Sequence, residues 1–188
     1  MNIITLWFQN IAPHLTQQSW QKTVASFKKK VITHNIKEPY NISKTPLGKP
    51  YIPHESNPDN WHFSTSHTHC MIVMIWAQMQ PVGVDVEAIN RNISQKVIQR
   101  MFHPNEIAWL AKYPKQAIHF WTAKESLAKA TGLGGYRSFK QFPILCQKAD
   151  LTLKAPDPWH LKHIILNNHL IYITHALNQP NIQIKEII

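Results

Sequence analysis

The sequence predicts an α+β fold, because segments with strand and helix patterns follow one another in mixed order and several strands adjoin as hairpins. Strand segments are continuous or alternating in their apolar residues, whereas helix segments repeat apolar residues every three or four positions. A hydrophobic content of 44% with seven Trp in 188 residues supports a packed core. This length allows one sizeable domain or two small, tightly packed halves.

The chain opens with an apolar strand and an amphipathic helix. The strand is expected at residues 2–8 and the helix at residues 16–31. Apolar residues recur in the helix at spacings of four, three and four, which places them on one face: Trp20, Val24, Phe27 and Val31. The lysine run 28–30 closes this helix, where cations interact favourably with the C-terminal carbonyl groups. A phosphate-binding patch is the alternative interpretation of these lysines.

A proline-rich loop and three strands follow. Five prolines indicate that residues 39–60 form an extended loop rather than a helix. Residues 61–66 alternate like an edge strand, and the apolar run 70–77 is typical of a central strand buried on both faces. After a short turn, a strand at 82–87 is expected to pair antiparallel with the strand before it.

Three helices are predicted next. Ser94 is a suitable N-cap for the first, and Pro104 suits the first turn of the second. The longest helix is expected at 115–131, with Gly132 as its C-cap. The remaining strand patterns, two of them joined by an Asn-Asn turn, lie at 150–154, 159–166, 170–174 and 181–188.

The chain is strongly basic, with 20 Lys and Arg against 10 Asp and Glu and a formal charge of +10. Such a charge attracts nucleic acid, anionic membranes, phosphorylated small molecules or acidic proteins. No segment approaches the ~20 apolar residues of a membrane span, and the N-terminus does not resemble a secretory signal. Cys70 and Cys146 are far apart and form no C-x-x-C pattern, which favours a reduced, cytoplasmic protein.

Two acidic residues stand out within the strand pattern PVGVDVEAI. Because strand side chains alternate between faces, Asp85 and Glu87 share one face with Gly83. The opposite, apolar face holds Val82, Val84 and Val86. Two neighbouring carboxylates repel each other and lose solvation when they are covered, so this pair requires a specific reason.

The longest predicted helix adds a third acid. Glu125 shares a face with Trp121, and with Lys129 it makes the i,i+4 spacing of a surface ion pair worth about 0.3–0.5 kcal/mol. The alternative is that Asp85, Glu87 and Glu125 together form the oxygen-rich site that Mg²⁺ prefers, completed by water and substrate phosphates. Nearby lysines would then bind those phosphates as point charges.

These segments resemble a known family. G-V-D-V-E at 83–87 and W-T-A-K-E-S-L-A-K-A-T-G at 121–132 resemble the 4′-phosphopantetheinyl transferases, in particular the single-chain group related to the activators of surfactin synthetase. G-K-P at 48–50 and F-S-T-S-H at 63–67 resemble two further motifs of the family, in the expected order. Glu106 stands where members carry an acid.

The resemblance implies a reaction. Such enzymes move the phosphopantetheine arm of coenzyme A onto a serine of an acyl, aryl or peptidyl carrier protein and release 3′,5′-ADP. It implies that Asp85, Glu87 and Glu125 hold Mg²⁺ against the pyrophosphate of coenzyme A. Glu125, directly or through a water, would accept the serine proton.

The resemblance also assigns the basic residues. Lys124 and Lys129 would contact the pyrophosphate or stabilise the leaving group. The residues expected to bind coenzyme A, mainly through its phosphates, are Lys49, Pro50, Ser66, His67 and Lys129. A basic face, with the lysine run 28–30, Arg91 and Arg100 as candidates, would attract an acidic carrier protein.

The fold implied by the resemblance is a pseudo-dimer of two similar α+β halves with the active site in the cleft between them. We expect the halves to cover residues 1–80 and 81–188, and such a chain would function as a monomer. Neither nucleic acid nor a membrane is expected as a partner.

Three other interpretations are weaker. A nucleic-acid-binding module would suit the basic charge, but the basic residues are dispersed and no recognised motif is present. A zinc site at His67, His69 and Cys70 lacks partners at ligand spacing. A relative that binds coenzyme A without transfer is disfavoured by its intact acids and lysines.

Overall fold

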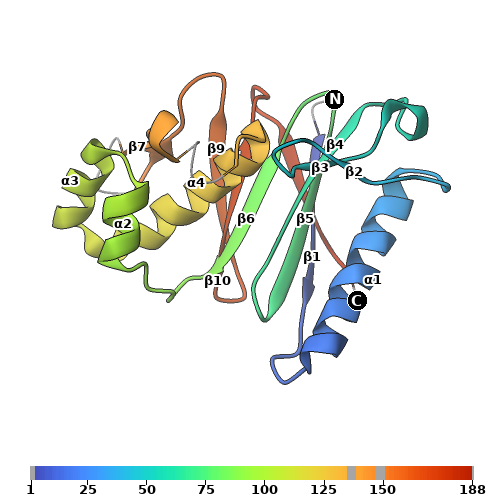
Figure 1. Cartoon of the computed structure of the whole chain (residues 1–188), viewed down its shortest axis with the longest axis horizontal. Coiled ribbons are helices and arrows are strands. Elements are labelled where there is room, and N and C mark those ends of the chain that lie inside the picture. Colours follow the sequence, from blue (N-terminus) through green and yellow to red (C-terminus); the bar gives the residue numbers. More distant parts are fainter. Residues whose placement is uncertain (1–2, 135–138, 147–150, 188) are drawn as a thin grey trace.

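A computed structural model describes residues 3–134, 139–146 and 151–187. Two β-sheets pack face to face, and each sheet carries a long helix on its outer face (Figure 1). The prediction of an α+β fold is confirmed. The pseudo-dimer of two similar halves stays a prediction.

The first sheet has the strand order β11-β1-β5-β4. Its members are β1 (Ile3–Asn10), β4 (Trp61–His67), β5 (Met71–Gln78) and β11 (Asn181–Glu186). β11 runs parallel to β1, whereas the other neighbours are antiparallel. This sheet combines three strands from residues 1–80 with β11 from the C-terminal part of the sequence. The division of the chain at residue 80 stays a prediction.

β5 is the central strand that its apolar run predicts. Its side chains alternate between two separate cores. Ile72, Met74 and Trp76 face the outer helix, and the inward face holds Met71, Val73, Ile75 and Ala77. Burial on both faces explains why the run contains no polar residue.

The outer helix of the first sheet, α1 (Gln17–Asn35), begins at the N-cap Thr16, whose side chain accepts from the Ser19 backbone N–H. Its apolar face, with Phe27 and Val31 fully buried, packs on β1 and β5. The helix extends beyond its predicted end at residue 31. The lysine run 28–30 therefore does not close the helix, and the basic residue of its last turn is His34.

The second sheet has the strand order β6-β10-β9, with every pair antiparallel. Its members are β6 (Gly83–Ala88), β9 (His160–Leu166) and β10 (His169–His175). Asn167 and Asn168 join β9 and β10 with φ of 47° and 60°. Positive φ at both central residues is the backbone of a tight hairpin turn that Asn tolerates.

The predicted pairing of β6 with the preceding strand is wrong. β6 hydrogen-bonds to β10, with Asp85 opposite Tyr172. Its valines instead pack, together with Ile171 and Ile173 of β10, on the inner face of the first sheet. β6 thus faces β5 across the layer between the two sheets, and its opposite face is free to meet a helix.

That helix is α4 (Ala117–Thr131), which follows a 3₁₀ turn at Pro114–Gln116 and ends at Gly132 with φ of 74°. It covers β6 and β10 on the outer face of the second sheet (Figure 1). α2 (Gln95–Met101) and α3 (Pro104–Lys112) flank it, with Ser94 and Pro104 at their predicted starting positions. In the described part of the chain, no helix is long and apolar enough to cross a membrane.

Two predicted segments are more complex than expected. The proline-rich loop contains a small hairpin of β2 (Ser43–Lys44) and β3 (Pro50–Tyr51) and a 3₁₀ helix at His54–Ser56. The strand predicted at 150–154 is reduced to β8 (Leu153–Lys154), which pairs with β7 (Leu145–Cys146). Residue 150 lies outside the described residues.

Candidate functional site

The site begins where β6 and α4 cross at very short distance. A Cβ atom added to Gly83 would lie 1.9 Å from the carbonyl oxygen of Ser126 and 2.5 Å from the backbone nitrogen of Ala130. Only glycine permits this approach of helix and strand backbones. As a result, the acidic face of β6 lies directly under α4.

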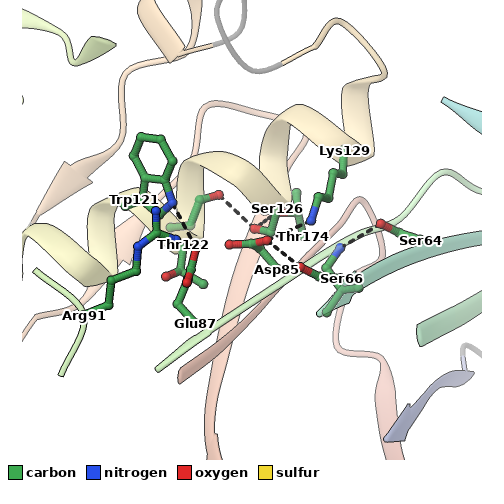
Figure 2. A network of polar contacts seen from close by, with 12 residues as sticks. Ser64, Ser66, Asp85, Glu87, Arg91, Trp121, Thr122, Ser126, Lys129 and Thr174 are labelled. Carbon is green, nitrogen blue, oxygen red and sulfur yellow. Dashed lines mark hydrogen bonds and ion pairs between the residues drawn. The ribbon is translucent and has the colours of Figure 1, made fainter. Parts of the chain in front are cut away.

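Asp85 is buried in this junction, with 5% of its surface exposed. Its Oδ1 accepts hydrogen bonds from Ser66 Oγ and Lys129 Nζ, both at 2.7 Å (Figure 2). Its Oδ2 is also buried but has no hydrogen-bond partner among the described residues. Burial raises the pKa of Asp85 above its ordinary value, although Lys129 and Ser66 both favour the charged form.

Glu87 lies two residues further along the same face. Its Oε1 accepts from Trp121 Nε1 at 3.3 Å and forms an ion pair with Arg91 Nη1 (Figure 2). The Arg91 guanidinium also lies over the Trp121 ring, 5.6 Å from its centroid. The charge of Glu87 is therefore balanced by a different cation from that of Asp85.

Glu125 lies one helical turn before Lys129 on α4. It lines a cavity of about 260 Å³ together with Lys129 and Lys49. Burial, followed by repulsion from Asp85, raises the pKa of Glu125 to about 7, although the positive charge of Lys129 opposes the shift. The third acid is therefore within electrostatic reach of the β6 pair.

The three acids do not form a preassembled metal cluster. Across residues 3–134, 139–146 and 151–187, no group of three or more His, Cys, Asp or Glu side chains is arranged to hold an ion. Asp85 and Glu87 instead face separate cations. Their chemistry nevertheless fits a divalent ion, because such an ion would satisfy the buried Oδ2 of Asp85 and offset the repulsion between Asp85 and Glu125, which adds to the effect of burial on the pKa of Glu125.

Lys49 reaches the same cavity from the proline-rich loop, between β2 and β3. Its Nζ donates to the carbonyl oxygen of Ala130 at 2.7 Å, so it contacts the C-terminal end of α4. Burial lowers the pKa of Lys49 to about 8. Pro50 lines the cavity beside it. The structure therefore brings the G-K-P motif into contact with α4. The order of the two motifs along the sequence does not show this contact.

A group of positive charges lies at the end of β4. His67 packs edge to face against Trp20, with ring centroids 4.7 Å apart. Partial burial, followed by the positive charges of Lys28 and Lys129, lowers the pKa of His67. The pKa of Lys28 is likewise lowered, first by burial and then by Lys129. The lowered pKa favours the neutral form of His67, and the charges of Lys28 on α1 and Lys129 on α4 beside it make this region favourable for an anion.

Lys124 does not lie at the site, which corrects the prediction that it contacts the pyrophosphate. Its side chain is 1% exposed, and its Nζ donates to Glu106 Oε1 at 2.7 Å and to the Phe142 carbonyl at 3.1 Å. Phe102 and Phe139 place their rings near the same ammonium group. Lys124 therefore belongs to the core between α3 and α4.

The sequence held a signal for the burial of Lys124 but not for the pairing of Arg91 with Glu87. Lys124 follows the fully buried Phe120 by four residues, the spacing of one helix face, so its burial could have been predicted. Arg91 follows Glu87 by four residues, but that spacing implies contact only in a helix, and the residues after β6 form a turn. The pairing of Arg91 with Glu87 was therefore not predictable from local pattern.

Comparison with known proteins agrees with this geometry. Residues 81–174, half of the chain, match the family model of the 4′-phosphopantetheinyl transferase superfamily. Over 106 residues the chain is 33% identical to the 4′-phosphopantetheinyl transferase gsp of Aneurinibacillus migulanus. The alignment covers 54% of this chain and 42% of the relative, so the chain matches about two fifths of that protein's length. The range matched by the family contains both β6 and α4.

Proposed function

The chain belongs to the 4′-phosphopantetheinyl transferase superfamily, and on that premise we propose that it transfers the 4′-phosphopantetheine group of coenzyme A to a serine of an acyl or peptidyl carrier protein. The serine oxygen forms a bond to the β-phosphorus, the bond to the leaving phosphate oxygen breaks, and 3′,5′-ADP departs. The observation that carries this proposal is the placement of Asp85, Glu125 and Lys129 together where β6 meets α4.

The proposed metal is Mg²⁺, held by Asp85, Glu87 and Glu125. When bound, it supplies positive charge that offsets the negative charge of the pyrophosphate and of the acids themselves. The orphaned oxygen of Asp85 and the raised pKa of Glu125 support this assignment. Lys129, which already contacts Asp85, is near enough to the same region to bind a phosphate oxygen.

The proposed coenzyme A site uses cations from both halves. Lys49, beside Pro50, lines the cavity that Glu125 and Lys129 share. Lys28 and Lys129 repel each other beside His67, and a phosphate bound there would offset that repulsion and could contact the His67 ring. Ser66 acts less directly than the sequence suggests, because its hydroxyl donates to Asp85 and holds that carboxylate in place.

Glu125 is the proposed proton acceptor. It lines the cavity, whereas Asp85 is committed to Ser66 and Lys129. The Glu125 carboxylate would remove the proton from the serine hydroxyl, directly or through a water. Lys124 is left out of the mechanism because its ammonium group is committed to Glu106.

The partners in this proposal are coenzyme A and an acidic apo carrier protein, with neither nucleic acid nor a membrane involved. The cytoplasm is the proposed location, since the widely separated cysteines indicate a reducing compartment. A single chain would be sufficient, because both halves of the site come from the same polypeptide.

The test is a transfer assay on a panel of apo carrier proteins with coenzyme A and Mg²⁺, read by the mass of the carrier. We expect the wild type to add the phosphopantetheine mass and Asp85→Asn to lower the rate roughly 100-fold or more. Asp59→Asn, at an exposed acid in the proline-rich loop, is the matched control and is expected to transfer normally.

Coenzyme A binding separates this function from its nearest alternative. A wild-type chain that binds coenzyme A but modifies no carrier in the panel would be a non-catalytic relative. Equal transfer rates for the wild type and Asp85→Asn would show that the Asp85 carboxylate is not needed for the reaction.

A further inference from the structure

Glu87 receives two donors on a single oxygen. The Arg91 guanidinium pairs with Oε1, and the Trp121 indole N–H donates to the same atom at 3.3 Å. Asp85 likewise receives both of its donors on one oxygen, Oδ1, and its Oδ2 is buried without a partner among the described residues. The two acids of β6 differ in the cation that each one faces, which is Lys129 for Asp85 and Arg91 for Glu87.

The two partners of the Glu87–Arg91 pair differ in exposure. The Arg91 side chain is 46% exposed and the Glu87 side chain is 14% exposed. A guanidinium at this exposure regains water when it leaves, so separating the pair costs little on its side. Glu87, by contrast, is fixed on a strand beneath α4 and would require a replacement cation.

The positive charge of Arg91 also reaches the third acid. Glu125 is stabilised in its charged form by Arg91 as well as by Lys129. Arg91 thus supplies charge to two of the three acids that are proposed to hold the metal. A divalent ion placed among these acids would experience repulsion from the guanidinium at short range.

We propose that Arg91 competes with the divalent ion for Glu87 and so sets the metal affinity of the site. This inference rests on the proposed function, because it takes Glu87 as a ligand. While the metal is away, Arg91 neutralises Glu87 and rests on the ring of Trp121. With a divalent ion held by Glu87, the Arg91 guanidinium would move outward to water. Arg91 is therefore a positioning residue that acts through Glu87 and not on the substrate.

The test measures metal binding and not turnover. Mn²⁺ is the probe, and its free concentration is followed by electron paramagnetic resonance with wild type and variants in the absence of coenzyme A. We expect Arg91→Gln to bind Mn²⁺ about three- to tenfold more tightly than the wild type does. This range corresponds to the loss of one competing positive charge that is partly exposed to water. Arg91→Lys, which keeps the competing charge, is expected to stay near wild type.

Lys96→Gln is the matched control, since it removes one positive charge from an exposed position on α2. It is expected to leave Mn²⁺ affinity unchanged. Equal or weaker binding by Arg91→Gln would overturn the inference, because Arg91 would then hold Glu87 in place for the metal. Absence of Mn²⁺ binding in the wild type and in Arg91→Gln would also overturn the inference. In that case, the carrier assay with the wild type shows whether the proposed transfer function stands without the inference about Arg91.

Discussion

At the scale of single residues, Lys124 shows how a motif position can serve the core. Its partner Glu106 also accepts the backbone N–H groups of Ile144, at 2.6 Å, and of His103, at 2.8 Å. One carboxylate therefore joins α3, α4 and the segment before β7. Removing one member of a buried, hydrogen-bonded ion pair leaves a charge without compensation, which costs more than the pair itself contributes.

We therefore expect Lys124→Met to lower the free energy of unfolding by about 3–5 kcal/mol, measured by urea denaturation. Lys112→Met, at the exposed C-terminal turn of α3, is the control and is expected to have little effect. Transfer by the folded fraction of Lys124→Met is expected to persist at low temperature. If Lys124→Met kept the wild-type free energy of unfolding but lost transfer activity, Lys124 would have a role in catalysis and not in the core.

At the scale of elements, the crossing of β6 and α4 controls the site. Gly83 is needed because helix backbone occupies the position of a Cβ atom, and not because of an unusual backbone angle. The same crossing places Lys129 of α4 on Asp85 of β6. A change that separates the two elements would therefore reduce both stability and catalysis.

Gly83→Ala is expected to lower the free energy of unfolding by about 3 kcal/mol, the upper part of the range for an overpacked core. It is also expected to reduce transfer roughly 100-fold through displacement of Asp85. Thermal unfolding and the carrier assay measure the two effects. The double variant Gly83→Ala/Ala130→Gly should remain destabilised, because the closest contacts are with backbone atoms; recovery in that variant would contradict this explanation.

Most elements were predictable from local pattern, whereas their partners were not. The caps at Ser94 and Gly132 and the alternation of β6 depend on neighbouring residues, and the structure confirms them. The partner of β6 is β10, which lies more than 80 residues further along the chain. The short turn between β5 and β6 suggested a hairpin of these two strands, because consecutive strands usually pair, and that prediction was wrong.

The same limit applies to the candidate site. Spacing showed that acids lie on β6 and α4, but the cation that balances each acid is decided by packing. Lys129 contacts Asp85, and Arg91 contacts Glu87. Lys28 and His67 approach each other only because α1 lies beside the end of β4.

At the scale of the whole molecule, the formal charge of +10 bears on the proposed function, in which the partner is an acidic carrier protein. Opposite net charges accelerate association, and dissolved salt weakens this attraction. We expect kcat/KM for the carrier to fall about tenfold when NaCl is raised from ~50 mM to ~500 mM, mainly through association.

A carrier in which the acids near its serine are neutralised provides the control. Its kcat/KM is expected to be lower at low salt and to change less with added NaCl. The same value of kcat/KM for the unaltered carrier at both salt concentrations would show that net charge has no part in the encounter.

The parallel pairing of β11 with β1 has a consequence for biosynthesis. Asn10 and Glu186, which are joined by a side-chain hydrogen bond, stand 176 residues apart. During translation β1 emerges before β11, and the edge of β1 that pairs with β11 remains without that neighbour until residues 181–186 have left the ribosome. A nascent chain stalled between β1 and β11 would therefore expose an edge that invites pairing with other chains.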